Sequence, residues 1–179
     1  MSSRTTYIDT TAIVEEGAII GEGVSIWNWS KIRKGASIGE NTSIGQNVYV
    51  DTDVVIGKRC KIQNGVSVYK GVTLGDDVFV GPYAVFTNDH TPRAFGEWSI
   101  VNTIVDTGAS IGANATILCG VKLGRYCMIG AGSVVTINVA PHTLVVGVPA
   151  RPVDYVTIRG RRLNWDVNKG LPAIDLLSD

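Results

Sequence analysis

The sequence predicts an all-β protein that winds as a solenoid of short parallel strands. The main evidence is a large apolar residue at every sixth position, with no polar residue among fourteen in succession. These positions are Ile8, Val14, Ile20, Ile26, Ile32, Ile38, Ile44, Val50, Ile56, Ile62, Val68, Leu74, Val80 and Phe86. A smaller residue commonly stands two places earlier, and Gly often stands beside the large one. An α-helix repeats its apolar residues about every 3.6 positions and a strand about every two, so a period of six indicates the flat sides of a triangular coil.

The interior and the corners of the coil follow from this period. The large residue points inward on each side, and the small one points inward near the corner, as at Ala36 and Thr42. Gly and Asn near the corners supply turn conformations that include positive φ. They are Gly23, Gly35, Asn41, Asn47, Gly65 and Gly71. Successive coils stack at the strand spacing of ~4.8 Å, so the core is predicted to be one continuous column.

Composition predicts one domain and argues against several partners. The 179 residues are enough to bury a core, and the 16 basic and 16 acidic side chains balance, so neither nucleic acid nor an anionic membrane surface is an expected partner. No apolar run is long enough for a membrane span, and Met1–Thr6 lacks the basic and apolar regions of a signal peptide. Of the three cysteines, Cys60 and Cys127 take inward positions and Cys119 a corner. Free thiols predict a cytoplasmic location.

Two tryptophans in the first coils, Trp27 and Trp29, fall on outer positions. Exposed aromatic side chains of this size usually cover a partner. They either pack against another subunit or form a stacking surface for a nucleotide base or a sugar. Arg33, on the next side of the coil, either meets a pyrophosphate or is a solvated surface charge. We assign Trp29 and Arg33 to substrate binding.

The middle coils carry two amides, Gln63 and Asn64, and Gln63 stands where most hexads have Gly or an acid. An outward pair of this kind either recognises the amide or hydroxyl edge of a ligand, such as a pyrimidine ring, or forms a side-chain ladder between coils. We assign both residues, together with Tyr69, to substrate binding.

The period breaks once, after Phe86, and resumes at Val105. It then continues through Ile111, Ile117, Leu123, Ile129 and Val135. The segment between the two parts, residues 87–104, reads TNDHTPRAFGEWSIVNTI and is rich in polar and charged side chains. Functional residues collect on loops that leave a solenoid, so this insertion is the predicted location of the chemistry.

His90 and Asn88 are the predicted catalytic residues of the insertion. A histidine has an ordinary pKa near ~6.5 and accepts a proton at cellular pH. His90 is therefore either a general base or substrate ligand, or a surface histidine. Asn88 can hydrogen-bond a substrate amine or carbonyl, and we assign Arg93 to substrate binding. The second histidine, His142, follows the last coil and is predicted to be a turn residue.

Small residues dominate the outer positions of the last coils, at Ala113, Gly130, Ala131 and Gly132. A smooth outer face lets a long flexible ligand lie flat on the backbone, and the pantetheine arm of coenzyme A is such a ligand. The alternative is tight packing of subunits or coils. We assign these four residues to cofactor binding. The period is lost after Val153, so residues 154–179 are predicted to form a short C-terminal tail that packs on the coil or on a neighbouring chain.

The repeat and its ending, Gly147-Val148-Pro149-Ala150-Arg151, resemble the hexapeptide-repeat acyltransferases over residues 7–153. The resemblance implies a left-handed parallel β-helix of hexapeptide repeats with one protruding loop. The hand comes from the resemblance, because the general rule for parallel crossovers gives the opposite one. The resemblance further implies acetyl-CoA as co-substrate, Arg151 near a phosphate of the coenzyme, and a homotrimer with sites between neighbouring subunits.

A narrower resemblance rests on Val85–Ala94, with Lys61–Asn64 and Val66–Tyr69 upstream. These segments are similar to N-acetyltransferases that act on nucleotide-linked 3-amino sugars. The resemblance implies acetyl-CoA-dependent transfer to the 3-amino group of a dTDP- or UDP-linked amino sugar, with Asn88 facing the substrate.

Three other functions are weighed against this one. O-acetylation of a sugar or another small hydroxyl acceptor is the main alternative, and it requires a true base, because a hydroxyl is a weaker nucleophile than a neutral amine. Zinc chemistry of the γ-carbonic anhydrase type needs three histidines and the chain has 2, so we expect no metal. A non-catalytic β-helix scaffold needs neither the polar insertion nor the Gly147–Arg151 ending.

Overall fold

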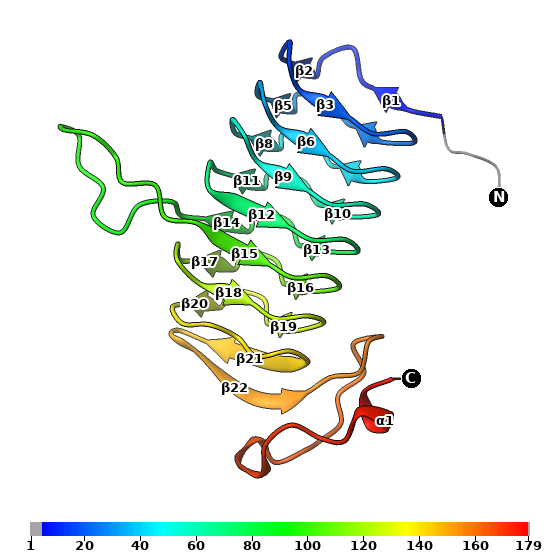
Figure 1. The fold of residues 1–179 in the computed structure, drawn as a ribbon, viewed down its shortest axis with the longest axis vertical. Coiled ribbons are helices and arrows are strands. Elements are labelled where there is room, and N and C mark those ends of the chain that lie inside the picture. Colours follow the sequence, from blue (N-terminus) through cyan, green and yellow to red (C-terminus); the bar gives the residue numbers. More distant parts are fainter. Residues whose placement is uncertain (1–4, 179) are drawn as a thin grey trace.

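The structure, a computed structural model, describes residues 5–178. It is a stack of flat coils with the N-terminus at one end and a short tail at the other (Figure 1). The prediction that Met1–Thr6 is not a signal peptide falls mostly on residues 1–4, which lie outside the described residues. Among the residues that are described, no helix has the length and apolarity to cross a membrane.

Three sheets, here named A, B and C, form the sides of the stack, and their strands pair in parallel except for the last pair of sheet A. Sheet A contains β1 (Tyr7–Ile8), β4 (Ser25–Ile26), β7 (Ser43–Ile44), β10 (Lys61–Ile62), β13 (Phe79–Val80), β16 (Ser110–Ile111), β19 (Met128–Ile129), β21 (Thr143–Gly147) and β22 (Ala150–Tyr155). Sheet B contains β2 (Ile13–Val14), β5 (Lys31–Ile32), β8 (Tyr49–Val50), β11 (Ser67–Val68), β14 (Val85–Phe86), β17 (Thr116–Ile117) and β20 (Val134–Val135). Sheet C contains β3 (Ile19–Ile20), β6 (Ser37–Ile38), β9 (Val55–Ile56), β12 (Val72–Leu74), β15 (Thr103–Val105) and β18 (Lys122–Leu123).

The pairing register confirms the predicted six-residue period. Ile26 lies opposite Ile44, and Ile44 lies opposite Ile62, so each coil uses three hexads before it returns to the same side. The predicted inward positions from Ile26 to Phe86 are all buried, and so are those from Val105 to Val135. Ile8 differs from the prediction, because no coil precedes it and its side chain is exposed.

The corners are as tight as the sequence suggests. All six predicted corner residues have positive φ, from 54° at Asn47 to 95° at Gly71. Gly39 meets a different constraint, because a Cβ there would lie 2.5 Å from the carbonyl carbon of Gly57 in the next coil. His142 has a φ of 57°, which confirms it as a turn residue.

Polar residues at the small inward positions hydrogen-bond to the next coil. The Ser30 hydroxyl donates to the Gly45 carbonyl over 2.6 Å, and the Thr42 hydroxyl donates to the Gly57 carbonyl over 2.8 Å. These two buried hydroxyls are thereby satisfied without water, whereas the buried Thr103 hydroxyl has no hydrogen-bond partner in the described structure. The predicted core cysteines, Cys60 and Cys127, are free and buried, and burial is the main reason that the pKa values of their thiols rise to about 11 and about 12.

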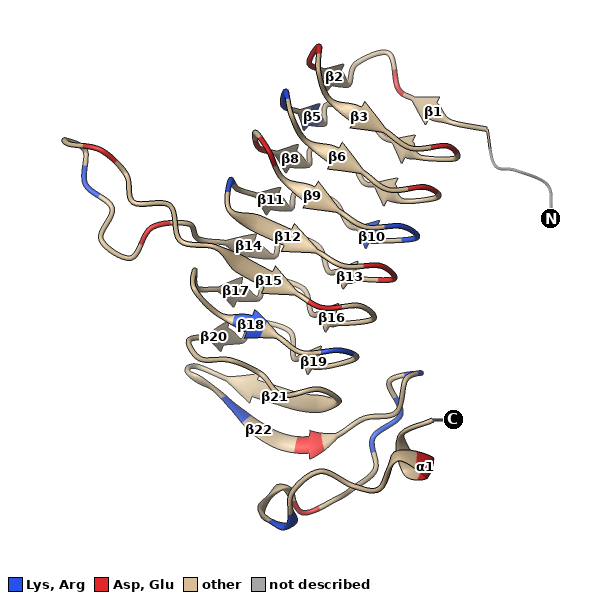
Figure 2. Cartoon of the chain, in the orientation of Figure 1, with Lys and Arg blue, Asp and Glu red and all other residues tan. Residues whose placement is uncertain are grey.

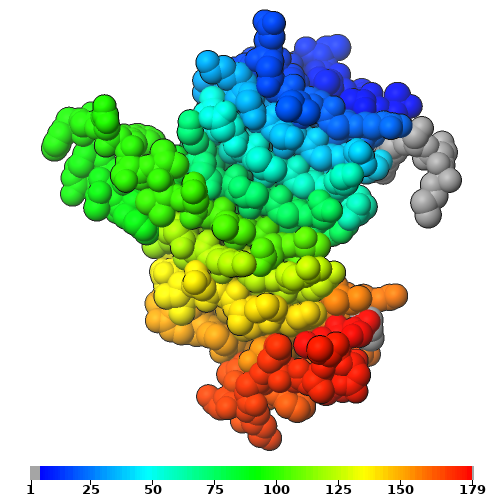
Figure 3. Space-filling view, in the orientation of Figure 1, coloured from blue at the N-terminus to red at the C-terminus, as the bar shows by residue number. Residues whose placement is uncertain are grey.

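The insertion leaves the stack after β14 and projects into solvent (Figures 1 and 3). Residues 87–102 form it, because Thr103 and Ile104 already pair with Val72 and Thr73 in sheet C. Every residue from 90 to 100 is exposed. The stack itself continues past the insertion in unbroken register, with Val85 opposite Thr116.

The last coil ends in an antiparallel pair, β21 and β22, and the tail folds beneath it. Asp154, which is buried, holds the tail by accepting hydrogen bonds from the amides of Tyr155, Asn164 and Trp165 and from the Arg162 guanidinium. Burial alone raises the pKa of Asp154, but these donors together hold it below its usual value. The tail also contains η1 (Val167–Lys169) and α1 (Ile174–Leu177).

Candidate functional site

The stack has three edges, each named here for the two sheets that meet there. The AB edge carries the corner residues Trp29, Gln63 and Asn64, with Ala113 and Gly130–Gly132 further along. The BC edge carries Arg33 and Tyr69 and the root of the insertion, with Asn88, His90 and Arg93. Sheet B lies between these two edges, so one chain holds the predicted site residues in two separate groups.

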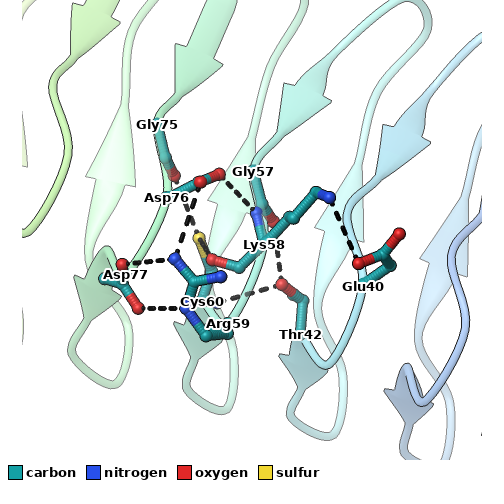
Figure 4. A network of polar contacts seen from close by, with 9 residues as sticks. All are labelled: Glu40, Thr42, Gly57, Lys58, Arg59, Cys60, Gly75, Asp76 and Asp77. Carbon is teal, nitrogen blue, oxygen red and sulfur yellow. Dashed lines mark hydrogen bonds and ion pairs between the residues drawn. The ribbon is translucent and has the colours of Figure 1, made fainter.

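The CA edge carries charged residues, which are coloured along the coils in Figure 2, and several of their side chains pair across coils (Figure 4). Lys58 Nζ lies 3.2 Å from Glu40, and the Arg59 guanidinium forms two hydrogen bonds of 2.7 Å to Asp77. The Arg59 contact also lowers the pKa of Asp77. No residue in our predicted site falls on this edge within the described part of the chain.

A hollow of about 320 Å³ lies on the AB edge between Trp27, Gln46, Gln63 and Asn64. Trp27 lines it, whereas Trp29, which we predicted to bind substrate, sits at the corner with a φ of 59° and is not part of the lining. The Asn64 side-chain oxygen accepts a hydrogen bond of 3.0 Å from the Gln46 backbone amide, so this side chain contacts the preceding coil, and its role in substrate binding stays a prediction. Gln63 makes no side-chain hydrogen bond among the described residues.

Further along the same edge the residues at Ala113 and Gly130–Gly132 have small side chains or none, although Asn114 is exposed beside them. Gly112 packs so closely on the next coil that a Cβ there would lie 2.5 Å from the Ala131 amide nitrogen. Ala131 and Gly132 are exposed at the following corner. The result is a smooth strip of backbone of the kind that we predicted for Ala113 and Gly130–Gly132.

Arg151 lies at the C-terminal foot of the stack, on β22. It lines a hollow of about 480 Å³ together with Val135, Asn138 and Tyr155. Its guanidinium donates to the Ala150 carbonyl over 2.9 Å. The lining is mostly apolar, and Arg151 supplies its positive charge.

Arg33 is held within its own chain on the BC edge. Its Nε lies 2.7 Å from Glu15 and its guanidinium donates to the Tyr49 hydroxyl over 2.9 Å. Hydrogen bonds from the Lys34 amide and from Arg33 lower the pKa of Glu15 to about 2. Tyr69 continues the stack, with its ring 5.8 Å from that of Tyr49. Of these side chains, Tyr69 is the one at the root of the insertion.

The root of the insertion is closed by backbone and side-chain contacts. The Asn88 carbonyl accepts from the Val101 amide over 2.9 Å, while the Asn88 side chain makes no hydrogen bond among the described residues. Asp89 turns into the loop and accepts from the amides of Thr91 and Ser99, which lower its pKa. Asp89 therefore orders the loop and does not hold the neighbouring imidazole.

His90 instead contacts the corner of the following coil. Its Nδ1 lies 3.4 Å from the Sγ of Cys119, a residue that our sequence reasoning placed at a corner and gave no role. The two are 29 positions apart, and the insertion breaks the regular spacing between them, so the period alone does not predict the contact. Arg93, further out, donates only to the neighbouring Pro92 carbonyl among the described residues, at 3.0 Å.

Metal-ligating side chains do not cluster in this structure. Within residues 5–178, no group of three or more His, Cys, Asp or Glu side chains is placed to hold an ion. Where the insertion meets the following coil, the described structure brings together the imidazole of His90 and the thiol of Cys119, with Asn88 two residues before His90.

Comparison with known proteins bears directly on this arrangement. The profile of the bacterial transferase hexapeptide family (six repeats) matches residues 17–52, 35–70, 53–88 and 102–136. Over 65 residues the chain is 49% identical to dTDP-3-amino-3,6-dideoxy-α-D-galactopyranose 3-N-acetyltransferase of Aneurinibacillus thermoaerophilus, a match that covers 36% of this chain and 31% of that protein. Over 46 residues it is 56% identical to serine acetyltransferase of Escherichia coli, covering 26% and 17%. These matches span less than half the length of the curated relatives.

Solved structures share the fold at low sequence identity. The acetyltransferase domain of PglB from Neisseria gonorrhoeae, in complex with acetyl coenzyme A, has a TM-score of 0.56 and 21% identity, covering 84% of this chain and 58% of that one. A mutant of AntD, an N-acyltransferase from Bacillus cereus in complex with dTDP-4-amino-4,6-dideoxyglucose and coenzyme A, has a TM-score of 0.53 and 19% identity, covering 85% and 83%. The family profile matches more than half of this chain, and the coils that it matches are those of the observed stack. The chain therefore belongs to the bacterial transferase hexapeptide family.

Proposed function

We propose that this chain is an acetyl-CoA-dependent N-acetyltransferase acting on the 3-amino group of a nucleotide-linked amino sugar, with dTDP or UDP as the carrier. The observation that carries the proposal is the insertion at the BC edge, which presents Asn88 and His90 at its root. Similarity to a relative named as a dTDP-3-amino-sugar 3-N-acetyltransferase supports the choice of acceptor. Family membership supports the choice of group transfer.

The reaction needs few protein groups, and the insertion supplies them. The neutral sugar amine attacks the thioester carbon, a tetrahedral oxyanion forms, the C–S bond breaks, and coenzyme A leaves as its thiolate. His90 takes the proton that the amine loses, and the Asn88 amide orients the amine. A backbone N–H donor on the flat face stabilises the oxyanion, and alignment of the two substrates supplies much of the remaining rate.

The two separate groups of residues support a site shared between subunits. Sheet B keeps the smooth AB strip of one chain away from the insertion on its BC edge. In a homotrimer, the insertion of one subunit lies against the AB edge of the next, and each site is complete only there. The proposed cofactor residues of that edge are Ala113, Gly130, Ala131 and Gly132, with Arg151 near a phosphate.

The sugar nucleotide is proposed to lie between the hollow of the AB edge and the insertion. Gln63 has a free amide in that hollow, and Trp27 offers a ring beside it. Arg93 is the proposed partner of the diphosphate, because Arg33 is already paired with Glu15. The three free cysteines fit an enzyme of the reducing cytoplasm. Both acetyl-CoA and nucleotide sugars are made in that compartment.

A thiol-release assay tests the proposal. Purified protein is incubated with acetyl-CoA and a panel of dTDP- and UDP-linked sugars that carry either an amine or a hydroxyl at the 3-position. We expect release only with 3-amino sugars, and a product that is heavier by one acetyl group. Release with the 3-hydroxy sugars and none with any 3-amino sugar would establish the O-acetyltransferase alternative instead.

A further inference from the structure

The corner formed by Cys119 and Gly120 differs from the equivalent corners of the other coils. The register places Cys119 in line with residues two positions beyond β2, β5, β8, β11 and β20. Those residues are Glu16, Lys34, Thr52, Lys70 and Ile137. They are long or polar and none is buried, whereas Cys119 is only 2% exposed. The small side chain of Cys119 thus occupies the corner that the insertion contacts.

Both legs of the insertion rest on this corner. Thr87 Oγ1 accepts a hydrogen bond of 2.9 Å from the Cys119 amide, and His90 Nδ1 lies 3.4 Å from its Sγ. A Cβ on Gly120 would lie 3.2 Å from a Val101 methyl and 3.3 Å from His90 Nε2. The His90 imidazole thus contacts the Cys119 thiol through Nδ1, and its Nε2 edge lies close to Gly120, where a side chain would crowd it.

We propose that Cys119 is a positioning residue that holds His90 in the tautomer needed for proton acceptance. In the proposed tautomer, Nδ1–H donates to Sγ and the lone pair lies on Nε2, the nitrogen with no hydrogen bond among the described residues. A metal-bound or catalytic histidine is generally oriented by a partner on its second nitrogen, and here a thiol takes the place of a carboxylate. The effect of Cys119 on catalysis rests on the proposed function, whereas the tautomer of His90 does not depend on any substrate.

The two histidines of the chain permit a direct test. Long-range proton–nitrogen spectra of ¹⁵N-histidine-labelled protein at about pH 8, where an ordinary imidazole is neutral, report the tautomer of each ring. His142 is an internal reference, because its Nδ1–H donates to the Val156 carbonyl over 3.0 Å. We expect His90 in the Nδ1–H form in the native protein and in Cys119→Ser, and a shift toward the Nε2–H form in Cys119→Ala.

The matched control is Cys127→Ala, which truncates another buried cysteine away from the insertion and is expected to leave both spectra unchanged. An unchanged His142 signal shows that a variant is folded. A native His90 in the Nε2–H form, or a His90 tautomer that is indifferent to Cys119→Ala, would overturn the proposal.

Kinetics provide the second readout once an acceptor is known. Cys119→Ala is expected to lower kcat about tenfold with the KM for acetyl-CoA unchanged, and Cys119→Ser to restore most of the rate. A raised KM for acetyl-CoA with kcat unchanged would instead mean that Cys119 shapes the cofactor site. Failure of every acceptor would count against the proposed function alone, because the tautomer is measured without substrate.

Discussion

The CA and BC edges are built from the same six-residue repeat, yet they differ in how far along the stack their corner side chains pair with one another. On the CA edge, Lys58 and Arg59 pair with carboxylates one coil away. On the BC edge, pairing of this kind runs from Glu15 to Lys70 and ends where the insertion begins. Beyond that point, within residues 5–178, the Asn88 side chain makes no hydrogen bond and the His90 ring contacts only the Cys119 thiol in this way. Charged side chains that pair with one another along an edge are not available to bind a ligand. The BC edge, which the insertion interrupts, keeps polar side chains that are available.

The largest effect is expected from damage to the stack beneath the insertion. Phe86 is fully buried and is the last residue before the chain leaves sheet B. Phe86→Ala is expected to lower the free energy of unfolding by about 3–5 kcal/mol, since it opens a cavity in the core column. Urea denaturation followed by circular dichroism measures this. Trp98→Ala, in the exposed insertion, is the control and should leave the midpoint unchanged; equal losses would mean that the insertion carries part of the stability.

His90→Ala is expected to lower kcat about 100-fold, because the sugar amine then loses its proton to water alone. Its urea midpoint should match that of the native protein, since the side chain is exposed. His142→Ala is the matched control: it removes a hydrogen bond to Val156 at the foot of the stack and should leave kcat unchanged. If both variants lose activity equally, the loss is not specific to the insertion, which would contradict the role proposed for His90.

Asp154 tests whether the foot of the stack depends on pH. Its folded pKa is lowered, so its contribution to stability is complete above the unfolded value of about 3.9 and is lost as pH falls through the folded value. Asp154→Asn is expected to lower the free energy of unfolding by about 2 kcal/mol at pH 7, because buried donors lose their acceptor. The gap between the two proteins should narrow at pH 3. A gap that is constant with pH would show that the carboxylate charge is not what holds the tail.

The smallest effect compares two residues of the insertion. Asn88→Ala is expected to lower kcat about tenfold, since its amide orients the acceptor, whereas Trp98→Ala changes kcat less than about threefold. Steady-state thiol release with the accepted amino sugar measures both. Equal losses would place the reactive part of the insertion at its tip instead of its root.

The sequence predicts the stack well because its period is local and repeats along almost the whole chain. The inward isoleucines and the corner glycines each follow from the residue type and its count by sixes. Pairing between coils also has a signal in the sequence: Glu15, Arg33 and Asp51 stand 18 positions apart, as do Glu40, Lys58 and Asp76, with alternating charge. That spacing alone predicts that Arg33 is occupied within its own chain.

The site is less predictable for a physical reason. The insertion breaks the count, so the sequence does not state on which corner His90 comes to rest. The contact with Cys119 depends on how residues 87–102 fold back, which no period describes. The one available signal is that Cys119 is small and apolar where other coils carry Glu16, Lys34 or Lys70.

Subunit complementation tests most directly whether the insertion of one chain works with the flat edge of another. His90→Ala removes the reactive side chain, and Ala131→Trp covers the smooth strip, so each variant alone should be inactive. Equal amounts of the two, unfolded together and refolded so that their subunits mix in the proposed trimer, should regain about one quarter of the native activity, because that fraction of shared sites combines an intact insertion with an intact edge. A mixture no more active than its separate components would contradict the account.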